Sequence, residues 1–266
     1  MGARLGQHFL MHPRIAERIV QVAGVSTEDT VLEIGPGKGM LTRALLRRAL
    51  AVIAIEADQN LFEKLKIDFA EEIQNGQLEL MYGDIRTYSL SKPIGQNKEY
   101  KVVANIPYYV TGEILRKFLS AEQQPSSMTL LVQKEVAERI ARSNPDAKRS
   151  GPRPKRRGKE SILSLSVKAY GTPHYEFTVP RGAFVPAPKV DSAVLSIRDI
   201  SRSRFQDGAT EKRFFELVRA GFAHKRKLLA SNLKEAGLEL PVSSLQSLAS
   251  SRAEDLSLAD WLALIH

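Results

Sequence analysis

Residues 31–42, VLEIGPGKGMLT, join an apolar run to a helical pattern through three closely spaced glycines. The apolar residues predict a buried strand, and the glycines permit a tight turn where a ligand can approach the main chain. N–H groups at the start of the next helix favour polar or anionic ligand groups. The spacing G-x-G-x-G differs from dinucleotide-binding and NTPase loops. Taken alone, the turn indicates a nucleotide-like ligand only weakly, since a plain strand–helix turn has the same composition.

Strand-like and helix-like segments alternate around this turn through the first two-thirds of the chain. Short runs rich in Val, Ile and Leu predict buried strands, with helical patterns between them. This order predicts an α/β fold with a mostly parallel sheet, right-handed crossovers and helices on both faces. A helix at 13–23 comes first. The predicted strands are 30–34, 51–56, 78–82, 100–105 and 128–133, and the predicted helices are 39–50, 58–73, 111–120 and 133–142.

Two further apolar segments, 162–170 (ILSLSVKAY) and 192–199 (SAVLSIRD), predict an antiparallel hairpin at the sheet edge. Apolar residues at helical spacing over 211–237 then predict a helix that ends at its last residue, a glycine, and shorter helices follow. We therefore expect an α/β domain over 1–200 and a small all-helical domain over 205–266.

Composition limits the class of protein. The chain has no cysteine, which excludes disulfides, thiolate catalysis and cysteine-ligated metals. No apolar run reaches the roughly 18 residues of a membrane helix, and the N-terminus lacks a secretory signal, so we expect a cytoplasmic protein.

Positive charge is concentrated in one segment. Of the net charge of +9, seven positive charges lie between Lys148 and Lys159 without any acid, so the rest of the chain carries only 9 − 7 = +2. Such a segment favours a polyanionic partner such as nucleic acid, although a solvated loop is the alternative.

Two acids lie at the carboxyl ends of the second and third predicted strands. Glu56, 21 residues after Gly35, is placed to accept hydrogen bonds from ribose hydroxyls, and Asp84 to accept from the exocyclic amine of an adenine. Either acid alone is also typical of a helix start or a turn. Because the carboxyl ends of parallel strands converge at one edge, the pair together with the glycine turn predicts an adenosine-type ligand.

The fourth predicted strand ends in Asn105-Ile106-Pro107-Tyr108, which resembles the N-I/L-P-Y form of the motif of amino-directed methyltransferases. Nearly the whole chain is similar to the 16S rRNA adenine N6,N6-dimethyltransferase family. The resemblance implies a Rossmann-like class I methyltransferase fold, S-adenosylmethionine as cofactor and no metal. Its segments, in order, are LGQHFL (5–10), LEIGPGKGMLT (32–42), IEAD (55–58), GDI (83–85), NIPYYVTGEIL (105–115), LVQKEVAERI (131–140), FVPAPKVDSAV (184–194) and RAEDLSLADW (252–261).

The chemistry of this reaction suits the motif. Adenine N6 is a poor nucleophile because its lone pair is delocalised, and two acceptors on its N–H groups localise that pair toward the methyl group. The Asn105 side-chain carbonyl and the Ile106 backbone carbonyl are the expected acceptors. Pro107 fixes the turn and withholds a donor, and Tyr108 offers a stacking face to the extruded base. The resemblance places Phe184 on the other side of the base. The plainer alternative is a proline turn after a buried strand.

The resemblance also implies a set of cofactor contacts, and one position departs from the family. The family usually has asparagine at the position of His8, although an imidazole can also donate or accept a hydrogen bond. The implied contacts are His8, Leu10, Gly35, Glu56, Asp84 and Asn105, to which the glycine turn adds Gly37.

Two basic regions are expected to face RNA. The segment 148–159 is longer and more basic than the family needs, and we expect it to contact rRNA phosphates. Replacing its basic residues would then flatten the salt dependence of RNA binding. A second cluster, His224 to Lys227, is either an rRNA contact or an ordinary solvated surface.

The resemblance implies a monomeric enzyme that dimethylates two adjacent adenines near the 3′ end of 16S rRNA during small-subunit biogenesis. Residues 1–200 would bind S-adenosylmethionine and 205–266 would dock on rRNA. Three alternatives stay open: a large-subunit rRNA methyltransferase of the macrolide-resistance type, a nicotinamide-dependent oxidoreductase, and a non-catalytic assembly factor. The segments at 184–194 and 252–257 favour the small-subunit family, and the glycine spacing and the NIPY motif (105–108) disfavour the oxidoreductase.

Overall fold

The computed structural model describes residues 7–88, 99–141, 159–238 and 250–265. The chain forms two compact units. The first comprises Met1–Ala137 and His174–Ile200, and the second comprises Glu138–Pro173 and Ser201–His266. Residues 138–173 therefore pack with the C-terminal part of the chain. The assignment of catalysis to 1–200 and of RNA docking to 205–266 stays a prediction.

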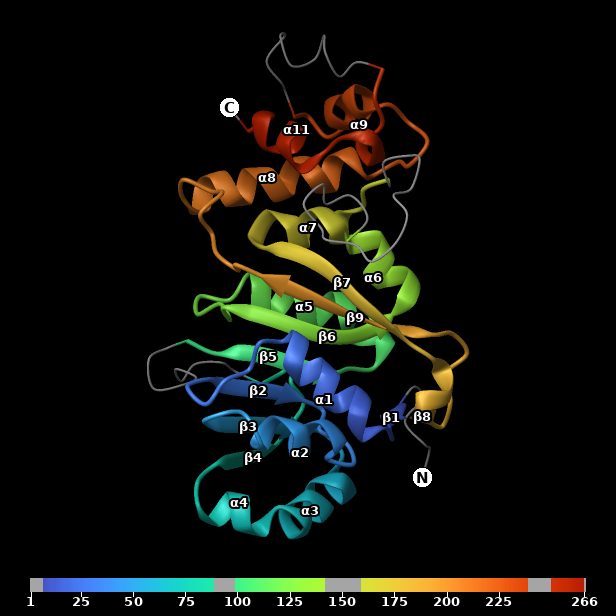
Figure 1. The fold of residues 1–266 in the computed structure, drawn as a ribbon. Coiled ribbons are helices and arrows are strands. Elements are labelled where there is room, and N and C mark those ends of the chain that lie inside the picture. The colour runs from blue at the N-terminus through green and yellow to red at the C-terminus, as the bar shows by residue number, and fades with distance from the viewer. Residues whose placement is uncertain (1–6, 89–98, 142–158, 239–249, 266) are drawn as a thin grey trace. The chain divides into compact units, whose positions relative to one another are not determined.

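A seven-stranded sheet forms the centre of the first unit (Figure 1), in the order β4-β3-β2-β5-β6-β9-β7. The pairs among β2 to β6 are parallel, and β9 runs antiparallel to β6. The predicted α/β fold is thereby confirmed. The strands are β2 (Thr30–Ile34), β3 (Ala51–Glu56), β4 (Leu78–Tyr82), β5 (Lys101–Asn105), β6 (Ser127–Gln133), β7 (Thr172–Val179) and β9 (Ser192–Arg198).

Strand β2 lies between β3 and β5, and all five of its residues are buried. From β2 the chain passes through α2 (Met40–Leu46) to β3 on one side, and from β5 it passes through α5 (Thr111–Leu119) to β6 on the other. Right-handed crossovers in opposite directions place these helices on opposite faces of the sheet (Figure 1). The carboxyl ends of β2 and β5 therefore border a crevice, which is where such sheets bind ligands.

Shorter elements complete the first unit. Helix α1 (Pro13–Val22) packs beside α2, and β1 (Phe9–Leu10) pairs antiparallel with β8 (Phe184–Val185). The predicted helix 58–73 is interrupted at Phe69, so it forms α3 (Gln59–Asp68) and α4 (Ala70–Gln74). The remaining single turns are η1 (Tyr108–Val110) and η2 (Arg181–Ala183).

The strand predicted at 162–170 is wrong, because these residues form helix α7 (Ile162–Tyr170) in the second unit. Serines alternating with apolar residues imitate a strand, but a Ser161 capping box starts a helix. Lys168 Nζ donates to Glu160 Oε1 (2.6 Å) and Ser164 Oγ donates to Glu160 Oε2 (2.6 Å), so polar residues four apart share one buried face. The strand at the sheet edge next to β9 is β7, which the sequence patterns did not predict.

The second unit is helical over its described residues. The predicted helix 211–237 breaks in two at the turn 222–228, because the buried Asn232 side chain donates to the carbonyls of Gly221 (2.6 Å) and His224 (3.1 Å). Gly237, with φ +68°, ends the second piece as predicted. The helices are α8 (Gly208–Gly221), α9 (Leu229–Glu235), η3 (Ala253–Asp255) and α11 (Leu258–Ala263), and the division of the chain into units falls inside α6 (Lys134–Ala141), after Ala137. Within the described ranges, no helix is long and apolar enough to cross a membrane.

Candidate functional site

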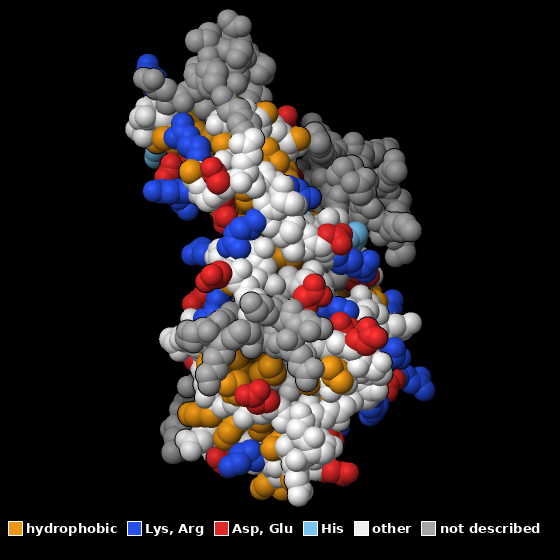
Figure 2. All heavy atoms as spheres, turned by 90° about the vertical axis from the view of Figure 1, so that its left-hand side faces the viewer, with side chains coloured by type: hydrophobic (Ala, Val, Ile, Leu, Met, Phe, Trp, Pro, Cys, Tyr) orange, Lys and Arg blue, Asp and Glu red, His pale blue; other side chains and the backbone are white. Residues whose placement is uncertain are grey.

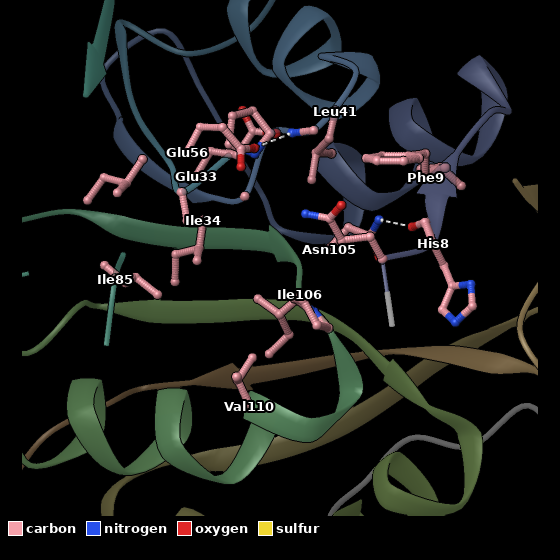
Figure 3. Close-up of a pocket in the computed structure, with 18 of the residues that line it drawn as sticks. His8, Phe9, Glu33, Ile34, Leu41, Glu56, Ile85, Asn105, Ile106 and Val110 are labelled. Atoms are coloured by element: carbon pink, nitrogen blue, oxygen red, sulfur yellow. Dashed lines mark hydrogen bonds between the residues drawn. The ribbon is translucent and has the colours of Figure 1, made fainter. Parts of the chain in front are cut away.

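A pocket of ≈ 320 Å³ opens at the carboxyl ends of the parallel strands. Figure 3 shows side chains from β1, β2, β3 and β5 converging on it. The predicted residues that line it are His8, Leu10, Gly35, Gly37, Glu56, Asp84, Asn105, Ile106, Pro107 and Tyr108. The structure therefore brings the glycine turn, both acids and the Asn-Ile-Pro-Tyr turn to one cavity, as parallel topology predicts for segments far apart in the sequence.

The glycine turn has the backbone conformation that its sequence predicts. Gly35 has φ +66° and Gly37 has φ +60°, a region that residues with a side chain rarely adopt. A Cβ on Gly37 would lie 3.0 Å from the Phe9 ring, whereas a Cβ on Gly35 would meet no atom within 4 Å. The lack of a side chain at Gly37 thus allows the Phe9 ring to pack against the turn. The lack of a side chain at Gly35 leaves open space beside the pocket that a ligand can occupy.

Glu56 closes one side of the pocket. Its side chain is buried, and its carboxylate accepts the N–H of Gly37 (3.0 Å) and of Asp58 (2.8 Å). Burial raises the pKa of Glu56, while the hydrogen bonds from these N–H groups lower it. The carboxylate therefore links the glycine turn to the start of α3 and keeps lone pairs for donors in the pocket.

Glu33 is a pocket residue that the sequence reasoning missed. It lies in β2 with 1% of its surface exposed, and its Oε2 has no hydrogen-bond partner in the described part of the chain. Burial raises the pKa of Glu33 to about 8, and the nearby charge of Glu56 raises it too, while Thr42 partly opposes them. The available signal was an acid inside the apolar run TVLEI, where only a functional or paired carboxyl is expected.

Asp84 lines the pocket but is paired in this structure. The Arg86 guanidinium donates from Nε to Oδ1 (3.0 Å) and from Nη2 to Oδ2 (2.6 Å), and Arg86 also lines the pocket. The Arg86 backbone N–H also donates to Asp84 Oδ1 (3.0 Å), so Arg86 occupies both oxygens of the carboxylate. The sequence patterns did not identify Arg86.

The Asn105 turn forms the opposite side of the pocket. Asn105 ends β5, and its Nδ2 donates to the His8 carbonyl at 3.0 Å (Figure 3). Pro107 has φ −58° and leads into η1. The Tyr108 hydroxyl shares a 2.7 Å hydrogen bond with Ser192, and burial raises the pKa of Tyr108. The tyrosine ring is therefore held at the pocket as a neutral phenol.

Phe184 is the one predicted site residue that does not line the pocket. It pairs with Leu10 in the β1–β8 ladder, is 2% exposed and belongs to the hydrophobic core. Its stacking role stays a prediction and requires the ring to become accessible. Tyr109, by contrast, lines the pocket and is 67% exposed.

In the second unit, the cluster His224–Lys227 forms the turn between α8 and α9. Lys227 and His224 lie 2.7 and 3.5 Å from Glu235, and no ion pair is recorded for Lys225 or Arg226 within the described ranges. Of the basic segment 148–159, only Lys159 is described, paired with Glu254; the rest lies outside the described residues. On the face drawn in Figure 2, basic and acidic side chains are intermixed.

Comparison with known proteins identifies similar chains. The family model described as ribosomal RNA adenine dimethylase matches residues 2–266. A protein named ribosomal RNA small subunit methyltransferase A in Dehalococcoides mccartyi is 40% identical to this chain, and the alignment covers 98% of this chain and 86% of the relative. The protein of the same name in Thermosynechococcus vestitus is also 40% identical, and the alignment covers 98% of this chain and 94% of the relative.

Solved structures show the same fold. A dimethyladenosine transferase from Plasmodium falciparum aligns with a TM-score of 0.76 and 27% identity, covering 97% of this chain and 96% of that one. The 23S rRNA methyltransferase ErmE aligns with a TM-score of 0.73 at 24% identity, covering 97% and 98%, a likeness that concerns the fold alone.

Proposed function

Because this chain belongs to the ribosomal RNA adenine dimethylase family, we propose that it dimethylates N6 of two adjacent adenines in a hairpin near the 3′ end of 16S rRNA. It is an S-adenosylmethionine-dependent rRNA dimethyltransferase. Family membership decides against the nicotinamide-dependent oxidoreductase that the glycine turn left open. The observation that carries the proposal is that the Asn105 turn lines the same cavity as Gly35 and Glu56.

The residues at the carboxyl ends of β2 and β3 fit the cofactor. When bound, S-adenosylmethionine supplies an electrophilic methyl group on a sulfonium centre. Gly35 leaves space for it, and Glu56 keeps acceptors for ribose hydroxyls. Glu33 has an unpartnered buried oxygen suited to a cationic group. Asp84 would accept from the adenine amine in place of one of its hydrogen bonds from Arg86.

On the acceptor side, Asn105 Oδ1 and the Ile106 carbonyl would accept the N–H groups of the target amine and direct its lone pair. Tyr108 would stack on the base, which must leave its helix to reach the pocket. Holding the amine in line with the methyl group supplies most of the rate gain. No covalent intermediate is required of the protein.

The choice of ribosomal subunit rests on the relatives. Those that are 40% identical over 98% of this chain are named as small-subunit enzymes, whereas the 23S rRNA enzyme shares 24% identity. We therefore favour 16S rRNA over the large-subunit alternative. Action during subunit biogenesis, a cytoplasmic location and a monomeric state complete the proposal.

RNA docking is assigned to the second unit. Glu235 of α9 pairs with Lys227 of the turn 222–228, while Lys225 and Arg226 have no ion pair among the described residues, so we assign both to rRNA phosphates. Replacing both with alanine should reduce the slope of log affinity against log salt by about 2, one per lost phosphate contact. The basic residues between 148 and 159 should contribute in the same way.

The direct test is transfer of tritiated methyl groups to unmethylated ribosomal particles. We expect incorporation into small subunits, with two methyl groups on each of two adenines, and none into large subunits. Asn105→Ala should lose about 10³-fold or more in transfer, because the amine loses a directing acceptor, while affinity for S-adenosylhomocysteine falls only modestly.

Three outcomes would contradict the proposal. Incorporation into large subunits alone would support the macrolide-resistance type. Tight particle binding without incorporation would support an assembly factor. Full activity of Asn105→Ala would remove the Asn105 turn from the mechanism.

A further inference from the structure

One residue of the N-terminal segment, His8, makes three contacts around the acceptor side of the pocket. Its backbone carbonyl accepts from Asn105 Nδ2 at 3.0 Å, and its Nδ1 lies 2.7 Å from the Pro186 carbonyl oxygen. Its ring lies 5.7 Å from the Tyr108 ring, tilted by 33°. These contacts join segments 97 and 178 residues apart. His8 thus connects the catalytic turn to the segment that follows β8.

The contact with Asn105 determines which way the amide faces. A carbonyl oxygen only accepts, so the NH₂ end of the amide must face His8. The opposite orientation would place two oxygens together. With Nδ2 committed to His8, Oδ1 is the end left for the pocket, and Oδ1 is the atom that must accept from the target amine.

The contact with Pro186 holds His8 itself in place. The Pro186 oxygen also only accepts, so Nδ1 carries the proton and donates. Two residues further on, Leu10 pairs with Phe184 in the β1–β8 ladder. The position of the His8 backbone carbonyl is therefore fixed by the hydrogen bond of the His8 side chain to Pro186 and by the β1–β8 strand pair that follows it.

We propose that His8 is a positioning residue for methyl transfer: its anchored carbonyl fixes the Asn105 amide with Oδ1 toward the target amine. This proposal rests on the proposed function. It is distinct from the cofactor contact that the sequence analysis implied for His8, which stays a prediction because His8 lines the same pocket. A positioning role acts on turnover, and a cofactor contact acts on cofactor affinity, so the two roles predict different measurements.

Three variants separate the roles. His8→Ala removes the anchor to Pro186, while His8→Asn keeps a donor at the equivalent atom, since Nδ2 of asparagine occupies the place of Nδ1. His12→Ala is the matched control, because His12 is an exposed histidine of the same segment whose side chain has no hydrogen bond to the described residues. Each variant is tested for kcat, for KM with small-subunit particles, and for Kd of S-adenosylhomocysteine by calorimetry.

We expect His8→Ala to lower kcat by roughly 10- to 100-fold, by analogy with the loss of a hydrogen bond that orients a metal ligand. This kcat is measured at saturating S-adenosylmethionine, so that a change in cofactor affinity cannot produce the loss. His8→Asn should recover kcat to within about 3-fold of wild type, and His12→Ala should match wild type.

Other results overturn the inference. A weaker Kd with unchanged kcat in His8→Ala would assign His8 to the cofactor. Equal loss of kcat in His8→Ala and His8→Asn would show that the anchoring donor is unimportant. Failure of the proposed function is distinguishable, because the wild-type protein would then transfer no methyl groups to small subunits.

Discussion

The two sides of the pocket are built in different ways. On the cofactor side, Glu56 bonds to main-chain groups 19 and 2 residues away, and Glu33 and Glu56 are both almost fully buried. On the acceptor side, contacts span 84 residues for Tyr108–Ser192 and 97 for Asn105–His8, and Tyr109 is 67% exposed. The cofactor side is formed by buried contacts between residues near one another in the sequence. The acceptor side is formed by contacts between segments that lie far apart in the sequence. Changes on the first side should therefore alter cofactor affinity, and changes on the second should alter turnover.

The largest expected effect on the cofactor side comes from Glu56→Ala. Hydrogen bonds to a charged group are worth about 1.5–3 kcal/mol each, so losing the ribose acceptors should weaken Kd for S-adenosylhomocysteine by roughly 100-fold. Turnover at saturating cofactor should stay within about 3-fold of wild type. Calorimetry measures this Kd, and single-turnover methyl transfer measures the rate. A fall in kcat at unchanged Kd would contradict the assignment of Glu56 to cofactor binding.

A second test introduces a side chain where a ligand is expected. Gly35→Ala should weaken cofactor binding by about 10-fold, because the new Cβ enters the open space at the pocket. Gly24→Ala is the control: it has a similar φ of +61° and equally open surroundings but does not line the pocket. Both should lose about 1 kcal/mol of stability in denaturant titrations, and only Gly35→Ala should lose affinity. Equal cofactor affinity of the Gly35→Ala and Gly24→Ala variants would contradict the placement of the cofactor beside Gly35.

A third test uses the raised pKa of Glu33. Between the ordinary value of 4.5 and about 8, the folded chain holds a proton that the unfolded chain releases. Stability of the ligand-free protein should therefore fall as pH rises through this window, by at most about 1.4 kcal/mol per pH unit. Cationic S-adenosylmethionine should bind more tightly above pH 8, where the carboxylate is ionised.

Glu33→Gln isolates this group, since the amide keeps the shape of the side chain but does not titrate. It should flatten the fall in stability between pH 5 and 8, measured by urea unfolding at each pH. An unchanged slope in Glu33→Gln would show that another group causes the pH dependence.

The smallest effect is expected from Tyr108→Phe on the acceptor side. It removes only the hydroxyl bonded to Ser192 and keeps the stacking face. A neutral hydrogen bond is worth about 1 kcal/mol, so kcat or KM for the particles should change by roughly 5-fold, with Kd for the cofactor unchanged. Tyr108→Ala should lose considerably more, and similar results for both variants would remove stacking from the explanation.

Several errors of sequence interpretation share one cause. A period of two over 162–170 predicted a strand, but the buried Glu160, Ser164 and Lys168 satisfy one another on a helix, which a polarity pattern does not reveal. The break at 222–228 likewise depends on the hydrogen bonds of the Asn232 side chain. Each feature requires a partner whose position is not encoded locally.

The amino-acid sequence by itself determined the set of parallel strands, the tight glycine turn, and the order of the acids and the Asn105 turn. These follow from local periodicity and from the rule that parallel strands end at one edge. Only the tertiary structure decided that Glu33 faces the cavity with an unpartnered oxygen, that Arg86 holds Asp84, and that His8 orients the Asn105 amide. Hydrogen bonds of this kind depend on ångström distances between remote segments, and those distances exist only after the chain has packed.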